Sequence, residues 1–109
     1  MKSVFAVIGI SATLLWAAPA FAAGDAGAGK ELYSKKCASC HGAAGEGNEK
    51  LAKMLKVDIP PLGSKEVQAK SDTDLKKAIL EGTGKMKAVA GIDAKAADDV
   101  VAYLRTLKK

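Results

Sequence analysis

Two cysteines and one histidine stand close together in this chain and could hold a metal-containing cofactor. Cys37 and Cys40 are its only cysteines, and His41 is its only histidine. Thiols three residues apart on a helical turn can both reach the edge of a flat macrocycle, and the adjacent imidazole can coordinate a metal at its centre. The pattern C-x-x-C-H is typical of covalent haem attachment. We therefore predict one haem c, attached to Cys37 and Cys40, with His41 as an axial iron ligand.

Three other uses of this motif fit the sequence less well. A structural zinc site needs four nitrogen or sulfur ligands, whereas this cluster supplies three. A thiol-exchange pair is expected beside a βαβ pattern, and no convincing strand pattern follows the first 22 residues. A disulfide across so short a loop would restrict the unfolded chain very little.

The first 22 residues have the features of a secretory signal peptide. Lys2 precedes an apolar run over 4–16, and the small residues Ala20 and Ala22 fit an A-x-A cleavage site. We predict that residues 1–22 are removed and that domain 23–109 lies outside the cytoplasm without stable membrane insertion. The compartment would be a periplasm or a lumen such as that of the thylakoid. An uncleaved anchor is the alternative, since the apolar run could nearly cross a bilayer.

The predicted mature domain is poor in aromatic residues and only modestly basic. Tyr33 and Tyr103 are its only aromatic residues, because every Phe and Trp falls in the leader. A chain this short builds a marginal core, which a covalently held haem would complete. Removal of Lys2 leaves 16 basic and 12 acidic residues, without the clustered stripe of a nucleic-acid-binding protein. We therefore expect no nucleic-acid partner.

Apolar periodicity and capping residues predict one all-α domain with three main helices. The first begins at Asp25 and carries the haem motif. The second begins at Ser71 and ends at Gly82. The third begins at Asp93 and ends near Leu107, with acidic residues early and basic residues late, as the helix dipole favours.

A shorter helix and an extended segment are expected between the first two main helices. Asn48 is a suitable cap for a helix whose buried stripe would be Leu51, Met54 and Leu55. Residues 59–63 contain two consecutive prolines, which cannot continue a helix. This segment is therefore predicted to be extended.

A methionine is the expected sixth ligand of an iron bound by His41, because the chain has no second histidine. Met54 falls on the apolar stripe of the short helix, where a methionine is usually part of the core. Met86 falls in a glycine-rich loop over 83–92, where the backbone can bring its sulfur to a metal. We predict Met86 as the ligand, with Met54 as the alternative.

Three segments together resemble the small monohaem class I c-type cytochromes of bacteria and algae. They are the helix with residues 29–33 that leads into CASCHG at 37–42, Gly-Lys-Met at 84–86 and the closing segment 100–107. The resemblance covers essentially the whole mature chain. It implies the class I cytochrome c fold, in which three main helices and shorter ones surround a covalently bound haem.

The resemblance also implies roles for individual residues. Gly29, Tyr33 and Tyr103 would lie where the first and last helices cross. A proline carbonyl, that of Pro61 or of the adjacent Pro60, would accept the Nδ1 proton of His41 and so orient the ring. The chain departs from many members after Met86, where it has Lys-Ala-Val in place of Pro-Ala-Phe.

An iron with both axial positions filled by protein is left with one-electron transfer as its chemistry. We therefore predict a monomeric electron carrier, not an enzyme and without catalytic residues, that shuttles between larger membrane or soluble redox proteins. Lysines near the predicted haem edge favour partners with acidic docking surfaces. These lysines are Lys35, Lys36, Lys53, Lys85 and Lys87.

Two alternatives for the function stay open. One is a haem protein with an open iron site, such as a gas sensor or a peroxidase-like enzyme, in which Met86 does not bind. No second histidine is present to act as an acid or base above that iron. The other is a fixed haem subunit of a larger oxidoreductase.

Overall fold

A computed structural model describes residue 9 and residues 24–109 of the chain, and this part is all-α. The predicted signal peptide and its cleavage site lie outside the described residues, so the division into leader and domain stays a prediction. Within the described residues, no helix has both the length and the apolar character needed to cross a bilayer. The helices are α1 (Ala26–Lys36), α2 (Ala38–His41), α3 (Glu49–Leu55), α4 (Lys65–Gln68), α5 (Asp72–Glu81) and α6 (Ala94–Thr106).

The capping residues read from the sequence begin the helices as predicted. The Asp25 carboxylate accepts hydrogen bonds from amides in the first turn of α1, and Asn48 does so for α3. Ser71 and Asp93 cap α5 and α6 in the same way. Each bond satisfies an amide that has no partner within its own helix, which is why the helix begins at that residue.

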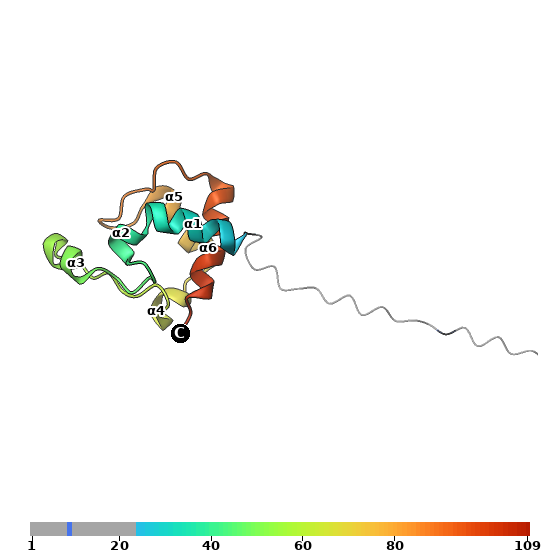
Figure 1. The fold of residues 1–109 in the computed structure, drawn as a ribbon, viewed down its shortest axis with the longest axis horizontal. Coiled ribbons are helices and arrows are strands. Elements are labelled where there is room, and N and C mark those ends of the chain that lie inside the picture. Colours follow the sequence, from blue (N-terminus) through green and yellow to red (C-terminus); the bar gives the residue numbers. More distant parts are fainter. Residues whose placement is uncertain (1–8, 10–23) are drawn as a thin grey trace, which may run out of the picture.

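The centre of the fold is the crossing of α1 and α6, which meet in Figure 1 above the C-terminus. Gly29 is buried there, and a Cβ atom at this position would collide with the carbonyl group of Asp99. The rings of Tyr33 and Tyr103 pack beside the crossing, with centroids 5.2 Å apart and planes inclined by 56°. Gly29, Tyr33 and Tyr103 therefore lie at the helix crossing, where the close neighbour of Gly29 is the backbone of α6.

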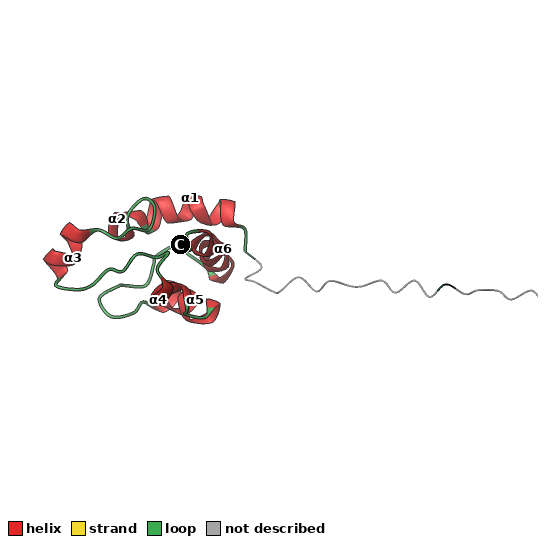
Figure 2. Ribbon diagram, turned by 90° about the horizontal axis from the view of Figure 1, so that it is seen from below, coloured by secondary structure: helices red, strands yellow, loops and turns green. Residues whose placement is uncertain are grey.

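The second layer of the fold is α5, which packs on α6. Leu75 and Ile79 of α5 are buried, as are Val100, Val101 and Leu104 of α6. Figure 2 shows α1, α2 and α3 along one side of the molecule, with α4 and α5 along the other. The long helices predicted from apolar periodicity are thus α1, α5 and α6.

The predicted buried stripe of α3 is wrong. No residue of this helix is buried, and the side chains of Met54 and Leu55 are 72% and 40% exposed. Figure 1 shows α3 at the opposite edge of the molecule from α6. The apolar spacing does favour a helix, but no element lies against the expected face, so periodicity alone did not determine burial.

The short helix α4 was not predicted, and it fixes the proline segment against α6. Its Gln68 side chain donates hydrogen bonds of 2.9 Å to the carbonyls of Leu62 and Leu104. The Arg105 guanidinium in turn donates to the carbonyl of Gln68 at 2.9 Å and to the carboxylate of Asp72. The segment 59–63, expected to be extended, is non-helical over 59–61, whereas residues 62 and 63 form a turn in which the Ser64 amide donates to the Pro61 carbonyl.

Candidate functional site

The two thiols and the imidazole lie on consecutive helical turns at the junction of α1 and α2. Cys37 ends α1, where its amide donates to the carbonyl of Tyr33 at 2.8 Å. Its own carbonyl then accepts the amide of His41 at 3.0 Å, which begins the short helix α2. The predicted single helix is therefore broken at Cys37, but the motif still forms one compact group.

Both thiols are free, with Cys37 buried and Cys40 exposed. Burial, and then the neighbouring Cys40, raises the pKa of the Cys37 thiol above its usual 9.0. Thiol-exchange enzymes need a lowered thiol pKa, so the environment of Cys37 disfavours that reaction. The disulfide and thiol-exchange alternatives therefore gain no support from the structure.

His41 is half-buried, and desolvation lowers the pKa of its imidazole. Its Nδ1 atom is buried and has no hydrogen-bond partner among the described residues. The neutral imidazole that burial favours is the form that binds iron. Two free thiols followed at once by a neutral imidazole are the donor set that haem c requires, so these residues fit the cofactor.

The described residues supply no further ligands for a zinc ion. Among the described residues, no group of three or more His, Cys, Asp and Glu side chains could hold a metal ion. The zinc alternative would need such a group, because a structural zinc has four protein ligands.

The loop after His41 is held by hydrogen bonds that position the motif. The Tyr33 hydroxyl donates to the carbonyl of Gly42 at 2.5 Å, which ties the motif to the α1–α6 crossing. Burial is the main reason that the pKa of Tyr33 rises to about 12, so the hydroxyl keeps its proton. The Gly47 amide donates to the carbonyl of His41 at 2.6 Å, and its φ of 88° suits a glycine.

The proline segment lies against this loop. The Leu62 amide donates to the carbonyl of Gly45 at 2.7 Å, and the Pro61 carbonyl accepts the amide of Ser64 at 3.0 Å. The predicted bond from His41 Nδ1 to Pro61 is not among the hydrogen bonds of the described residues. A carbonyl oxygen has a second lone pair, so this pairing stays a prediction.

Met86 is half-buried and sits in a tight turn after α5. Its amide and carbonyl pair with those of Thr83 at 2.9 Å each, which closes a turn through Gly84 and Lys85. Met54, the alternative ligand, is 72% exposed on α3. The backbone of Met86 is thus fixed, whereas Met54 projects from the surface.

A contact that the sequence did not predict joins the turn that carries Met86 to helix α3. The Lys85 ammonium donates to the carbonyl of Leu55 at 2.7 Å, so the Met86 turn is bonded to the C-terminal end of α3. The final carbonyls of a helix lack partners within it and carry partial negative charge, which favours a lysine there. A pairing of residues 30 positions apart has no local signal in the sequence.

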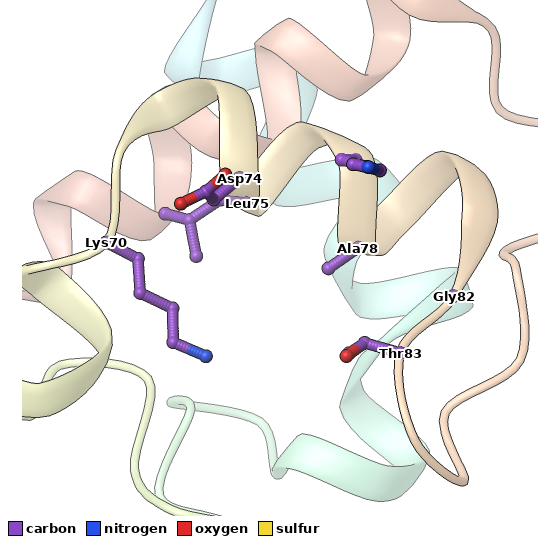
Figure 3. Close-up of a pocket in the computed structure, with 7 residues that line it drawn as sticks. Lys70, Asp74, Leu75, Ala78, Gly82 and Thr83 are labelled. Atoms are coloured by element: carbon purple, nitrogen blue, oxygen red, sulfur yellow. The ribbon is translucent and has the colours of Figure 1, made fainter.

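The inner face of α5 borders a cavity of about 310 Å³. Figure 3 shows the side chains of Lys70, Leu75 and Ala78 directed into the same opening, with Thr83 at its edge. The lining combines Leu75, Ala78 and Gly82 with four polar or charged residues, Lys70, Asp74, Lys77 and Thr83. Thr83 also pairs with Met86, so this cavity adjoins the turn that carries the predicted ligand.

Comparisons with known proteins agree with this reading of the motif. Residues 24–104 match the family described as cytochrome c oxidase, cbb3-type, subunit III. Cytochrome c-554(547) of Halothiobacillus neapolitanus is 40% identical over 93 residues, which cover 79% of this chain and 100% of that protein.

Solved structures of c-type cytochromes share the fold. The c-type cytochrome KustC0563 superposes with a TM-score of 0.63 at 28% identity, covering 74% of this chain and 98% of that one. Cytochrome CL of Methylophaga aminisulfidivorans MPT gives a TM-score of 0.59 at 22% identity. The latter covers 76% of this chain and 53% of that one, and it supports the fold alone.

Proposed function

Because the chain belongs to the cytochrome c family and therefore carries covalently bound haem c, we propose that it is a soluble, extracytoplasmic carrier of single electrons. Haem iron supplies the one-electron redox chemistry. In this proposal the mature monomer shuttles between larger redox proteins and catalyses no reaction of its own. The observation that carries the proposal is the group of two free thiols and a half-buried imidazole at the junction of α1 and α2.

The site assignment follows from the same group. Cys37 and Cys40 hold the haem, His41 is one axial ligand and Met86 is the other. The half-buried position of Met86 and the paired turn around it support this choice over the exposed Met54. The Pro61 carbonyl is the proposed partner of His41 Nδ1, which is buried and would otherwise lack a hydrogen bond.

The absorption spectrum of the purified holoprotein tests the proposal, because it reports which residues bind the iron. Met86→Ala is expected to remove the red charge-transfer band of ferric haem with histidine and methionine ligands, and to let the ferrous protein bind carbon monoxide rapidly. Met54→Ala is the matched control and should leave the band intact. Rapid binding of carbon monoxide by the unaltered protein would instead support the open-site alternative.

A second candidate is a haem subunit fixed in a larger oxidoreductase. The match to a family described as an oxidase subunit favours it, whereas full coverage of a protein named simply as a cytochrome favours an independent carrier. Gentle extraction distinguishes the two. A carrier would be released with the soluble fraction, and a subunit would stay with larger partners through size-exclusion chromatography.

A further inference from the structure

Helix α3 is attached to the molecule at its two ends. None of its seven residues is buried, so side-chain packing contributes little to holding it. At its start, the Asn48 side chain donates to the carbonyl of Ser39 at 3.1 Å and accepts the amide of Leu51 at the same distance. At its end, the Leu55 carbonyl accepts the Lys85 ammonium at 2.7 Å. Hydrogen bonds of two side chains therefore connect α3 to its surroundings.

The first of these bonds leads to the haem motif. Ser39 lies on α2, between the two cysteines and two residues before His41. The amide of Gly47, which directly precedes Asn48, donates to the carbonyl of His41 at 2.6 Å. The start of α3 is thus fixed to the short helix that carries the proposed histidine ligand.

The second bond uses a carbonyl that the geometry of the helix end leaves free. Lys56 has a φ of 54°, in the left-handed region, and turns the chain out of the helix. Its amide donates to the carbonyls of Ala52 and Lys53, and the Val57 amide also donates to that of Ala52. The Leu55 carbonyl has no partner within the helix and carries part of the negative charge of the helix C-terminus, which makes it a suitable acceptor for an ammonium group.

The turn that carries Met86 is fixed mainly at its base. Residues 83–85, 87 and 88 are exposed, and Met86 itself is half-buried. Thr83 and Met86 pair with each other, and the Val89 amide donates to the carbonyl of Ile79 on α5 at 2.9 Å. Lys85 lies at the tip of the turn, so its bond to α3 fixes the exposed part of the turn next to Met86.

We propose that α3 is a strap that ties the Met86 turn to the haem motif, with Asn48 and Lys85 as its positioning residues. This inference rests on the proposed function, in which His41 and Met86 are the two iron ligands. The two side-chain bonds lie at opposite ends of α3, about 10 Å apart along its axis. They act in series, so loss of either one detaches the turn from the motif and lets Met86 leave the iron more often. Loss of the second bond then has no further effect.

The test measures how fast added imidazole replaces Met86 in the ferric holoprotein, followed by loss of the red charge-transfer band. Imidazole binds only after the methionine has left, so the rate reports opening of the turn. Lys85→Gln is expected to react about fivefold faster, through loss of one hydrogen bond. Asn48→Asp should do the same, because its carboxylate still accepts the Leu51 amide but cannot donate to Ser39. The double variant should also react about fivefold faster, and not about 25-fold, since the bonds act in series.

Lys87→Gln is the matched control, because each of the three substitutions makes the net charge more negative by one. Lys87 is exposed and directly follows Met86. This variant should react like the unaltered protein, and so should Lys85→Arg, since a guanidinium can still donate to the Leu55 carbonyl. Equal acceleration in Lys87→Gln, a double variant about 25-fold faster, or no acceleration in Lys85→Gln would each overturn the inference. Failure of the proposed ligation by His41 and Met86 gives a different result, because the red band would be absent from the unaltered protein or would survive in Met86→Ala.

Discussion

The α1–α6 crossing and the α3 side of the molecule differ in what holds them together. At the crossing, Gly29 lets the backbones of two helices touch, Tyr33 is completely buried, and Asp99 reaches across to the amide of Asp25 at 2.8 Å. On the other side, α3 buries no residue and is linked to the rest by side-chain hydrogen bonds of Asn48 and Lys85.

The α1–α6 crossing therefore stabilises the fold, whereas the α3 side contributes little to its stability. The crossing supplies the packing that keeps the motif on α1 and α2 in place, because Tyr33 bonds directly to the carbonyl that follows His41. The α3 side can change its surface, or open locally, with little loss of core contacts. We expect substitutions in the two regions to differ most in their effect on global unfolding.

The largest effect is expected from Gly29→Val. The new side chain would overlap the carbonyl of Asp99 and push α1 from α6, because neither backbone can move aside without losing helical hydrogen bonds. The expected cost is about 3 kcal/mol of unfolding free energy. Urea unfolding of the holoprotein, followed by circular dichroism, measures it.

Gly27→Ala is the matched control on the same helix. A Cβ atom there meets only the carboxylate of Asp25, at 3.2 Å, which belongs to a side chain that can shift. Stability should change by less than about 1 kcal/mol, since alanine also favours the helix. Equal losses in both variants would mean that the crossing is not a close backbone contact.

Local features of the fold were predictable from the sequence, and distant ones were not. The caps Asp25, Ser71 and Asp93 act on amides two or three residues away, so their chemistry is visible in the sequence. The haem motif is equally local. Burial of Met54 depended on which element would lie opposite α3, and an apolar stripe does not contain that information.

Asp99 shows the same limit for a charged residue. The sequence indicates only that an acidic residue suits the first turns of α6. The structure buries Asp99 and pairs it with the amide of Asp25, 74 positions away. Likewise, the proposed roles of Met86 and Pro61 depend on distant segments meeting at His41. The missing second histidine and the glycine-rich loop suggested Met86, whereas the role of Pro61 came from the resemblance to a family.

A smaller effect, dependent on pH, is expected from Asp99→Asn. The bond from the Asp25 amide, and then Lys95, holds the pKa of the Asp99 carboxyl below its usual 3.8. A carboxyl whose pKa is lower in the folded than in the unfolded state stabilises the protein at pH values above its unfolded-state pKa. This stabilisation is lost as the pH falls through the folded-state pKa. The variant should therefore be less stable at pH 7, and the gap should close below about pH 4.

Urea midpoints measured at neutral and acidic pH test this prediction. Asp58→Asn, an exposed position that follows α3, removes the same charge on the other side of the molecule. It should shift the midpoint less at neutral pH. A gap for Asp99→Asn that widens in acid would show that the carboxylate is not stabilised in the folded state.

The smallest effect on global stability is expected from Asn48→Ala. Asn48 caps α3 through the amide of Leu51 at 3.1 Å and donates to the carbonyl of Ser39 at 3.1 Å. Loss of a cap destabilises a helix by about 1 kcal/mol, which corresponds to roughly fivefold faster amide exchange within α3. Because α3 buries no residue, global unfolding free energy should change by less than about 0.5 kcal/mol.

Ser71→Ala is the matched cap removal on the core side. Ser71 caps α5 through the amide of Asp74 at 3.1 Å, and α5 carries the buried Leu75 and Ile79. The same loss of about 1 kcal/mol should therefore appear in global unfolding, because α5 cannot open without exposing the core. Hydrogen exchange with urea unfolding measures both quantities. If Asn48→Ala lowered global stability as much as Ser71→Ala, α3 would belong to the cooperative core after all.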